Sequence, residues 1–177
     1  MTRIGLLSDT HDYLDTEVFR HFESVDEVWH AGDFGDLALA RALADFKPLV
    51  GVYGNIDGQD IRSRFPERQF WTCGEVPVFM IHIGGYPGRY APGVRAEIIH
   101  RRPRLFICGH SHILKIQYDE ATQCLHINPG AAGNQGWHHV RTLVRFEIDG
   151  ERIGNCQVIE LGPRSGQTTK NRLRPGQ

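Results

Sequence analysis

The sequence predicts an α/β fold: a four-layer αββα sandwich in which two mixed β-sheets are flanked by helices. Two observations support it. In the first half, apolar runs of strand length alternate with amphipathic segments, and after residue 104 the pattern contains strands only. Alternation requires crossover connections and therefore parallel strands, whereas a run of strands joined by short turns favours antiparallel pairs. Two sheets stacked face to face, with the helices outside, satisfy both patterns.

The first half contains three predicted strands and two predicted helices. Residues 3–7 form a buried strand, and 15–25 form an amphipathic helix with its apolar side chains on one face. Residues 26–32 and 48–54 are the next two strands, and the helix 36–46 lies between them. This order predicts a parallel sheet at the start of the chain.

The second half begins with a hairpin, in which 68–73 and 76–83 flank Gly74-Glu75. A helix at 93–102 then precedes a buried strand at 104–109. The remaining predicted strands are 114–119, 124–128, 141–148 and 155–161, with a hairpin turn at Asp149-Gly150.

The 177 residues are long enough for one domain with a proper core, which we place at 1–162. Residues 163–177 have no apolar period and only basic charges, so we expect a disordered basic tail. We find no internal repeat.

Composition excludes several classes of function. The formal net charge of −1 gives no argument for nucleic-acid or anionic-membrane binding. Apolar runs are too short for a membrane span, and the N-terminus does not resemble a secretory signal, so we expect a cytoplasmic protein. The four cysteines are widely spaced, which disfavours disulfides and zinc-thiolate sites.

Ionisable and amide side chains gather where predicted strands end. Because loops at the carboxyl ends of parallel strands converge on one crevice, these segments are expected to meet. Each alone has an ordinary reading as a turn residue, a cap or a packed histidine; together and in order they favour a metal site. The residues are Asp9, His11, Asp33, Asn55, Asp57, His82, His110 and His112.

The spacing and residue types narrow the chemistry. In an extended chain, the side chains of residues i and i+2 point to the same side. Each of two segments is therefore expected to present two ligands together: Asp9 with His11, and His110 with His112. Flanking glycines such as Gly54 allow close backbone approach. A mixed oxygen and nitrogen set without thiolate suits Mn, Fe, Zn or Ni better than Ca or Mg.

Without Asp57, the set contains two Asp, one Asn and four His. Seven ligands are too many for one catalytic ion and suit two ions that share a carboxylate. Two divalent ions and two aspartates leave a charge of about +2, or about +1 with a bound hydroxide, which favours a phosphate-like substrate group. Two such ions can generate hydroxide and stabilise both sides of an in-line displacement.

The motifs Asp-x-His, Gly-Asp, Gly-Asn, His and Gly-His-x-His, in this order, resemble the calcineurin-like metallophosphoesterases. Asn-Pro-Gly at 128–130 makes the chain similar to the small bacterial and archaeal phosphodiesterase branch, and the resemblance covers residues 3–160. It implies one ion on Asp9, His11 and His112, a second on Asn55, His82 and His110, and a bridge through Asp33. A hydroxide between the ions would attack phosphorus, and manganese is the metal that the family commonly uses.

The sequence departs from this family at two points. Many relatives carry a histidine after Gly-Asn that assists the leaving group, and Ile56 stands there instead. His82 is followed by a Gly/Pro-rich loop of its own. We therefore predict rates that depend steeply on the pKa of the leaving group.

Further candidates have weaker signals. Asp12 is a candidate for orienting a ligand imidazole, or is a residue at the start of a helix. Arg89 and Tyr86, just past His82, are candidates for binding the substrate phosphate. His138 and His139 lie in a loop that could line the cleft, and neither is counted as a site residue. Asn128 is read as a turn residue, and His30 and His126 as packing or surface residues.

The predicted function is phosphodiester hydrolysis of a small phosphate ester with two divalent ions, most commonly manganese. The alternatives are a phosphomonoesterase or nucleotidase on the same site, or a non-catalytic scaffold, as one eukaryotic trafficking subunit uses this architecture with a depleted ligand set. Trp71 and Trp137 could mark an oligomer interface or belong to the core. The physiological substrate cannot be derived from these motifs.

Overall fold

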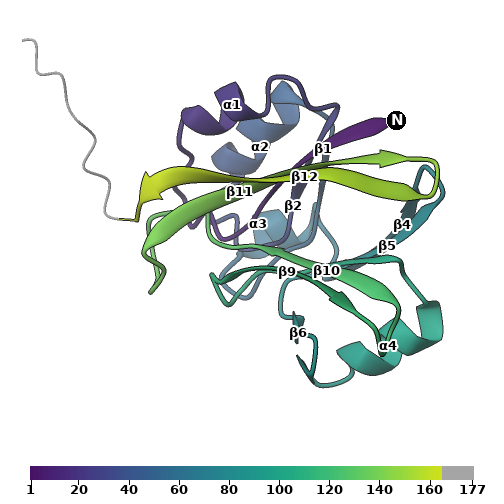
Figure 1. The fold of residues 1–177 in the computed structure, drawn as a ribbon. Helices are drawn as coiled ribbons and strands as arrows, with labels where there is room; N and C mark the ends of the chain where they lie inside the picture. Colours follow the sequence, from purple (N-terminus) through teal and green to yellow (C-terminus); the bar gives the residue numbers. More distant parts are fainter. Residues whose placement is uncertain (165–177) are drawn as a thin grey trace, which may run out of the picture.

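The computed structural model describes residues 1–164, which form two stacked five-stranded sheets and a two-stranded ribbon (Figure 1). The first sheet consists of β1 (Thr2–Leu7), β2 (Glu27–His30), β3 (Leu49–Gly51), β11 (Val140–Asp149) and β12 (Arg152–Pro163), in the order β12-β11-β1-β2-β3. The second consists of β4 (Arg68–Cys73), β5 (Val76–Ile81), β8 (Leu105–Ile107), β9 (Leu114–Asp119) and β10 (Cys124–Pro129), in the order β4-β5-β8-β10-β9. The ribbon pairs β6 (Gly85–Tyr86) with β7 (Arg89–Tyr90).

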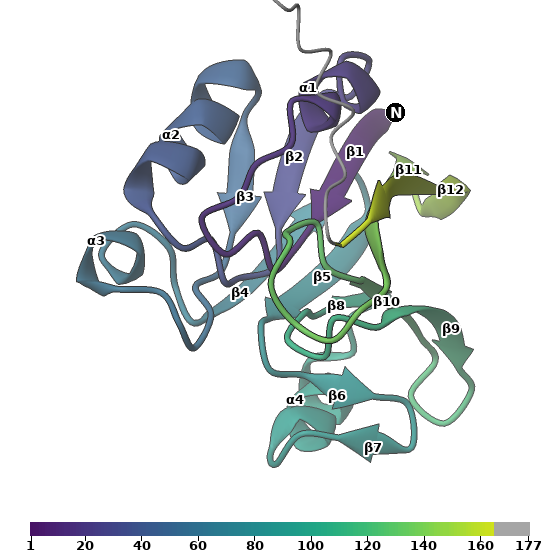
Figure 2. The ribbon, with the colours of Figure 1, turned by 90° about the vertical axis from the view of Figure 1, so that its left-hand side faces the viewer.

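The helices cover the outer faces, so the predicted four-layer sandwich is confirmed. Residues of α1 (Glu17–His21), α2 (Leu37–Phe46) and α3 (Gln59–Arg62) pack in one apolar cluster with the first sheet. Those of α4 (Val94–Arg101) pack in another with the second sheet, on the opposite side of the molecule (Figures 1 and 2). A third cluster, with Trp29 at its centre, lies between the two sheets.

The predicted parallel start is also confirmed, because β1, β2 and β3 pair in parallel. Their arrowheads end at one edge of the sheet (Figure 2). In the second sheet β5, β8 and β10 are parallel as well, and the β4–β5 and β9–β10 pairs are antiparallel. The β11–β12 pair of the first sheet is also antiparallel. The carboxyl ends of the parallel strands carry the candidate ligands.

The structure corrects several predicted boundaries. The helix predicted at 15–25 ends at His21. Asp26 accepts a hydrogen bond from the Arg3 amide, which draws the chain into β2 beside β1. The sequence pattern missed α3 and the β6–β7 ribbon, which are too short to show a period. The last strand is longer than predicted and includes Pro163, the first residue of the predicted tail; residues 165–177 lie outside the described part of the chain.

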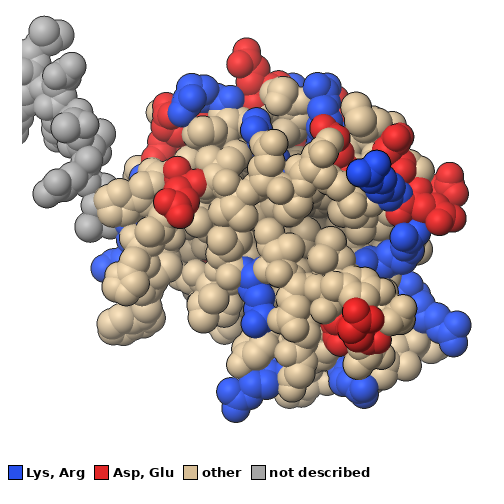
Figure 3. All heavy atoms as spheres, viewed as in Figure 1, with Lys and Arg blue, Asp and Glu red and all other residues tan. Residues whose placement is uncertain are grey.

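The described residues include no helix long and apolar enough to cross a membrane. Charges of both signs are scattered over the face in Figure 3, without a block of one sign. The four cysteines are free thiols. Trp71 packs against Trp29 in the core, with ring centroids 4.9 Å apart, whereas Trp137 is 97% exposed, so only Trp137 is available to an interface.

Candidate metal centre

The pairing of β1 with β2 continues past the strand ends into the loops that carry the first ligands. The amides of Asp9, His11 and Asp12 donate to the carbonyls of Gly32, Asp33 and Phe34 at 3.0, 3.1 and 3.1 Å. The two loops therefore run side by side on main-chain hydrogen bonds. This brings the side chains of Asp9 and His11 next to Asp33.

Five of the seven predicted ligands have left-handed backbone conformations, with φ between 46° and 67°. Such conformations cost energy for residues other than glycine, and they persist where the surroundings enforce them, often at functional sites. The residues are Asp9, His11, Asp33, His110 and His112. The expectation of extended chain from Asp9 to His11 and from His110 to His112 is therefore wrong, because all four residues are left-handed.

Six of the predicted ligands form two groups of three. Asp9, His11 and His112 each offer a donor atom within 4.8 Å of the others, and so do Asp33, His82 and His110. In the first group, His112 Nε2 lies 3.1 Å from Asp9 Oδ1 and 3.2 Å from His11 Nε2.

Asp33 lies between the two groups. Its Oδ2 is 3.1 Å from His82 Nε2 and 3.6 Å from His11 Nε2, so one oxygen is near an imidazole of each group. Burial acts to raise the pKa of Asp33, but the contact with His82 and the Ile56 amide outweigh it, and the pKa lies below its ordinary value. The carboxylate form is therefore favoured at neutral pH.

Each buried carboxylate is held by one oxygen and leaves the other directed at imidazoles. Asp9 Oδ2 accepts from the His110 amide at 3.1 Å, and Asp33 Oδ1 accepts from the Ile56 amide at 3.1 Å. Asp9 Oδ1 is buried and has no hydrogen-bond partner within residues 1–164. A buried carboxylate oxygen without a partner is unfavourable unless a cation binds it.

His82 is oriented in the same way. Its Nδ1 donates to the Ala31 carbonyl at 2.7 Å, which fixes Nε2 as the nitrogen with the free lone pair. Nε2 is buried and has no hydrogen-bond partner among the described residues. Burial lowers the pKa of His82, but the carboxylates of Asp33 and Asp9 more than offset this and raise it.

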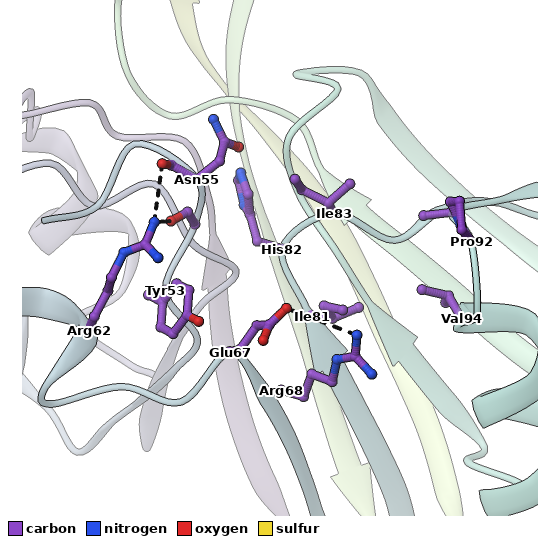
Figure 4. A pocket seen from close by; sticks show the side chains of 12 residues that line it. Tyr53, Asn55, Arg62, Glu67, Arg68, Ile81, His82, Ile83, Pro92 and Val94 are labelled. Carbon is purple, nitrogen blue, oxygen red and sulfur yellow. Dashed lines mark hydrogen bonds and ion pairs between the residues drawn. The ribbon is translucent and has the colours of Figure 1, made fainter. Parts of the chain in front are cut away.

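Asn55, the seventh predicted ligand, is exposed and lies beside His82 at the end of a cavity (Figure 4). The glycine before it lets its loop approach Asp33. A Cβ on Gly54 would lie 2.0 Å from Asp33 Oδ1 and 2.4 Å from its amide nitrogen. The glycine thus permits the predicted close approach, to a carboxylate that is itself a candidate ligand.

Asp57 holds the loops after β2 and β3 together through their backbone amides. It is buried and accepts hydrogen bonds from the amides of Gly35 and Gly54 at 2.9 and 2.7 Å, which joins the loops after β2 and β3. Burial raises the pKa of this carboxyl. Asp57 was among the strand-end residues, but its spacing gave no sign that it contacts backbone instead of a metal.

Asn128 is not the turn residue that the sequence suggested. It lies in β10, is buried, and its Nδ2 donates to the Gly109 carbonyl at 2.8 Å and to Ser111 Oγ at 3.1 Å. Its side chain therefore holds the loop that carries His110 and His112. Only a contact between segments distant in sequence reveals this role.

His30 supports the other ligand loops. It is fully buried, its Nδ1 accepts from the Gly32 amide at 3.2 Å, and its Nε2 lies 3.0 Å from Thr10 Oγ1. Burial lowers its pKa to about 3, so the ring is neutral. The sequence reading of His30 as a packing residue is confirmed.

The remaining candidates lie around this centre. The Asp12 carboxylate makes no hydrogen bond to a ligand imidazole within residues 1–164, and α1 begins only at Glu17. Arg89 and Tyr86 contact each other in the exposed β6–β7 ribbon, at 3.5 Å. His138 lies against His112, with ring centroids 5.2 Å apart, whereas His139 is exposed.

The donor set fits divalent ions. Within residues 1–164, buried Asp9 Oδ1 and His82 Nε2 make no hydrogen bond, although His112 and Asp33, respectively, lie 3.1 Å from them. Two imidazole nitrogens also face each other at 3.2 Å, an arrangement that a shared cation stabilises. Asp9, His11 and His112 would hold one ion, and Asp33, His82 and His110 the other. The fold and this site define an α/β sandwich with two candidate metal-binding groups at one edge.

Comparison with known proteins identifies the family. Residues 2–151 match the model of the calcineurin-like phosphoesterase superfamily domain, and the chain belongs to this superfamily. A probable metallophosphoesterase of Methanocaldococcus jannaschii is 28% identical over 135 residues, which cover 72% of this chain and 67% of that protein. A phosphodiesterase of the same organism is 28% identical over 145 residues, covering 72% and 82%.

Solved structures confirm the fold. An archaeal phosphodiesterase has a TM-score of 0.72 at 23% identity, with 90% of this chain and 99% of that chain covered. Vps29 of Chaetomium thermophilum has a TM-score of 0.71 at 16% identity, with 92% and 100% covered. At these identities the likeness shows the architecture alone.

Proposed function

We propose that this protein hydrolyses phosphodiesters with two divalent metal ions. The observation that carries the proposal is the position of Asp33 Oδ2 between two groups of ligands, 3.6 Å from His11 Nε2 and 3.1 Å from His82 Nε2. When bound, the ions would supply hydroxide at neutral pH and withdraw negative charge from the phosphoryl oxygens.

The chain's own residues prepare the centre for this chemistry. One carboxyl oxygen each of Asp9 and Asp33 accepts a hydrogen bond from a backbone amide, and the Ala31 carbonyl holds His82 with Nε2 toward the centre. These supports fix the ligands before the substrate arrives, which is what a preorganised site requires. The mixed O/N donor set suits manganese, iron, zinc or nickel, and manganese is proposed because the family commonly uses it.

A diester is the proposed substrate class because one curated relative is a phosphodiesterase and because a dianionic monoester needs more positive charge. The two arginines that line the cavity beside Asn55 are already engaged by carbonyls or carboxylates. Arg89 and Tyr86 remain predicted phosphate contacts, and neither lines that cavity. The cytoplasmic location also remains a prediction.

A scaffold function is the second candidate, because the fold is shared with a protein named Vps29. The complete ligand set favours catalysis. The two are separated by hydrolysis of bis(p-nitrophenyl) phosphate by chelator-stripped protein, with and without manganese, beside an Asp33→Asn variant.

We expect manganese to restore turnover in the wild-type protein. The Asp33→Asn variant should have a turnover at least about 100-fold lower, because the ligand shared by both ions is weakened. p-Nitrophenyl phosphate in the same assay separates diesterase from monoesterase activity. Absence of turnover with manganese, iron, zinc and nickel would favour the scaffold.

A further inference from the structure

A cavity of about 370 Å³ opens directly beside the metal centre. Asn55 and His82 form one end of it, and the cavity extends from them toward α4 (Figure 4). A substituent on a phosphorus atom held at the centre would reach this space without leaving the protein surface. We call it the side cavity; its walls also contain Tyr53, Gly54, Arg62, Glu67, Arg68, Ile81, Ile83, Ala91, Pro92 and Val94.

The wall on one side is apolar. Ile83, Pro92 and Val94 project toward the space from the segment after His82 and from the start of α4 (Figure 4). Ile83 is 43% exposed, which is unusual for a large aliphatic side chain next to a buried ligand. Exposed apolar surface in a concave site is typical of a ligand pocket.

The charged residues of the side cavity are already engaged. Arg62 donates to the carbonyls of Asp57 and Asn55 at 2.6 and 3.3 Å, and its guanidinium lies 4.5 Å from the centroid of the Tyr53 ring. Arg68 is paired with Glu97 and lies 4.0 Å from Glu67. A second phosphate would find little free positive charge here.

The size matches a ring or a small ring system. Ligand pockets begin at about 300 Å³, and a pocket near this lower limit holds one aryl-sized group with some water. Both products must leave after hydrolysis, but the substituent that stays on phosphorus keeps its bond through the chemical step and can be enclosed during it. The side cavity therefore suits the retained substituent.

We propose that the side cavity binds an uncharged, ring-sized apolar substituent of the phosphodiester, on the side that remains attached to phosphorus. This inference rests on the proposed function and names its substrate class: aryl or similarly flat apolar diesters in preference to small alkyl diesters. Burying such a ring is worth about a 10- to 100-fold gain in kcat/KM.

The test compares two substrates with the same leaving group: phenyl p-nitrophenyl phosphate and methyl p-nitrophenyl phosphate, with the manganese-loaded protein. We expect a preference of about 10- to 100-fold for the phenyl ester, chiefly in KM. Ile83→Asp should reduce the preference to less than about threefold, because a carboxylate disfavours the ring. Ile99→Asp, at a residue 48% exposed on α4 and outside the cavity lining, is the matched control and should keep the preference.

A second variant and a binding measurement keep the outcome decisive. Ala91→Phe narrows the cavity and should lower turnover of the phenyl ester more than that of the methyl ester. Diphenyl and dimethyl phosphate, titrated calorimetrically into the manganese-loaded protein, should differ in affinity in the same direction.

Equal turnover of both esters by the wild-type protein would overturn the inference and leave the proposed function intact. If neither ester is hydrolysed, the proposed function fails. The calorimetric comparison then tests ring binding in the side cavity by itself. Tighter binding of diphenyl than of dimethyl phosphate, lost in Ile83→Asp, supports the inference, and equal affinities overturn it.

Discussion

Ile56 illustrates how one residue can support the metal centre while leaving a chemical task undone. Its amide holds Asp33 at 3.1 Å, and its side chain is 45% exposed beside Asn55. An aliphatic side chain cannot protonate a departing oxygen. Any residue except proline can donate to Asp33 through its amide, so this hydrogen bond does not require the isoleucine side chain.

The rate is therefore expected to fall steeply as the leaving-group pKa rises. Across a series of aryl phosphodiesters, log kcat/KM of the wild-type protein should have a strongly negative slope against that pKa. Ile56→His should flatten the slope and speed the poorest leaving groups at least about 10-fold, because general acid catalysis is typically worth 10²–10⁴-fold.

Ile56→Val is the control, since it keeps the amide and adds no acid. A flat slope for the wild-type protein would contradict this prediction.

Among the elements, β10 is unusual because it buries an ionisable side chain, that of His126. His126 lies in this strand, is 1% exposed, and neither ring nitrogen has a hydrogen-bond partner among the described residues. Burial lowers its pKa to about 4, below the ordinary value of 6.5. The unfolded chain therefore binds a proton that the folded strand excludes at mildly acidic pH.

Because the folded pKa is depressed, the stability linked to His126 is complete above pH 6.5 and is lost as the pH falls toward 4. At pH 5 the loss is about 1–2 kcal/mol. His126→Phe should remove it, since Phe packs against Phe106 without a titrating group. The other histidines are common to both proteins and cancel.

The measurement is the free energy of unfolding by denaturant at pH 8 and pH 5. The free energy of unfolding should fall between pH 8 and pH 5 by about 1–2 kcal/mol less in His126→Phe than in the wild-type protein. His100→Phe, at an exposed position of α4, should leave the difference as in wild type.

Prediction from sequence succeeded where a local pattern carries the information. Each candidate ligand follows a strand-sized apolar run, so parallel pairing of β1 with β2 brings Asp9 and Asp33 to one edge, and the stacking of the two sheets adds His82. Asp57 and Asn128 hold the ligand loops through backbone contacts between distant segments, which no spacing records. The side cavity likewise depends on how α4 packs beside His82, and short elements such as α3 have no period to detect.

At the scale of the whole molecule, the metal centre joins the two sheets. Asp9 and Asp33 follow strands of the first sheet, whereas His82 and the pair His110 and His112 follow strands of the second. Ions bound between them would cross-link the sandwich at one edge. Binding to the folded state alone stabilises it in proportion to the logarithm of ligand concentration over Kd.

Removal of metal should therefore lower Tm. At manganese concentrations of about 100 times Kd the stabilisation is about 2.7 kcal/mol, which for a chain of this size corresponds to roughly 5–10 °C. Thermal unfolding followed by circular dichroism, with and without a chelator, measures it. Asp33→Asn should show a smaller shift, and identical Tm values with and without all four candidate metals would contradict the proposed centre.

The main-chain hydrogen bonds that continue the β1–β2 pairing into the ligand loops have an evolutionary consequence. Asp9, His11 and Asp12 donate through their amides, so this pairing of the two loops does not itself require the side chains of those three residues. A chain that replaces Asp9 or His11 loses a candidate metal ligand and keeps these main-chain hydrogen bonds. This part of the architecture can therefore be inherited without the residues that would bind metal.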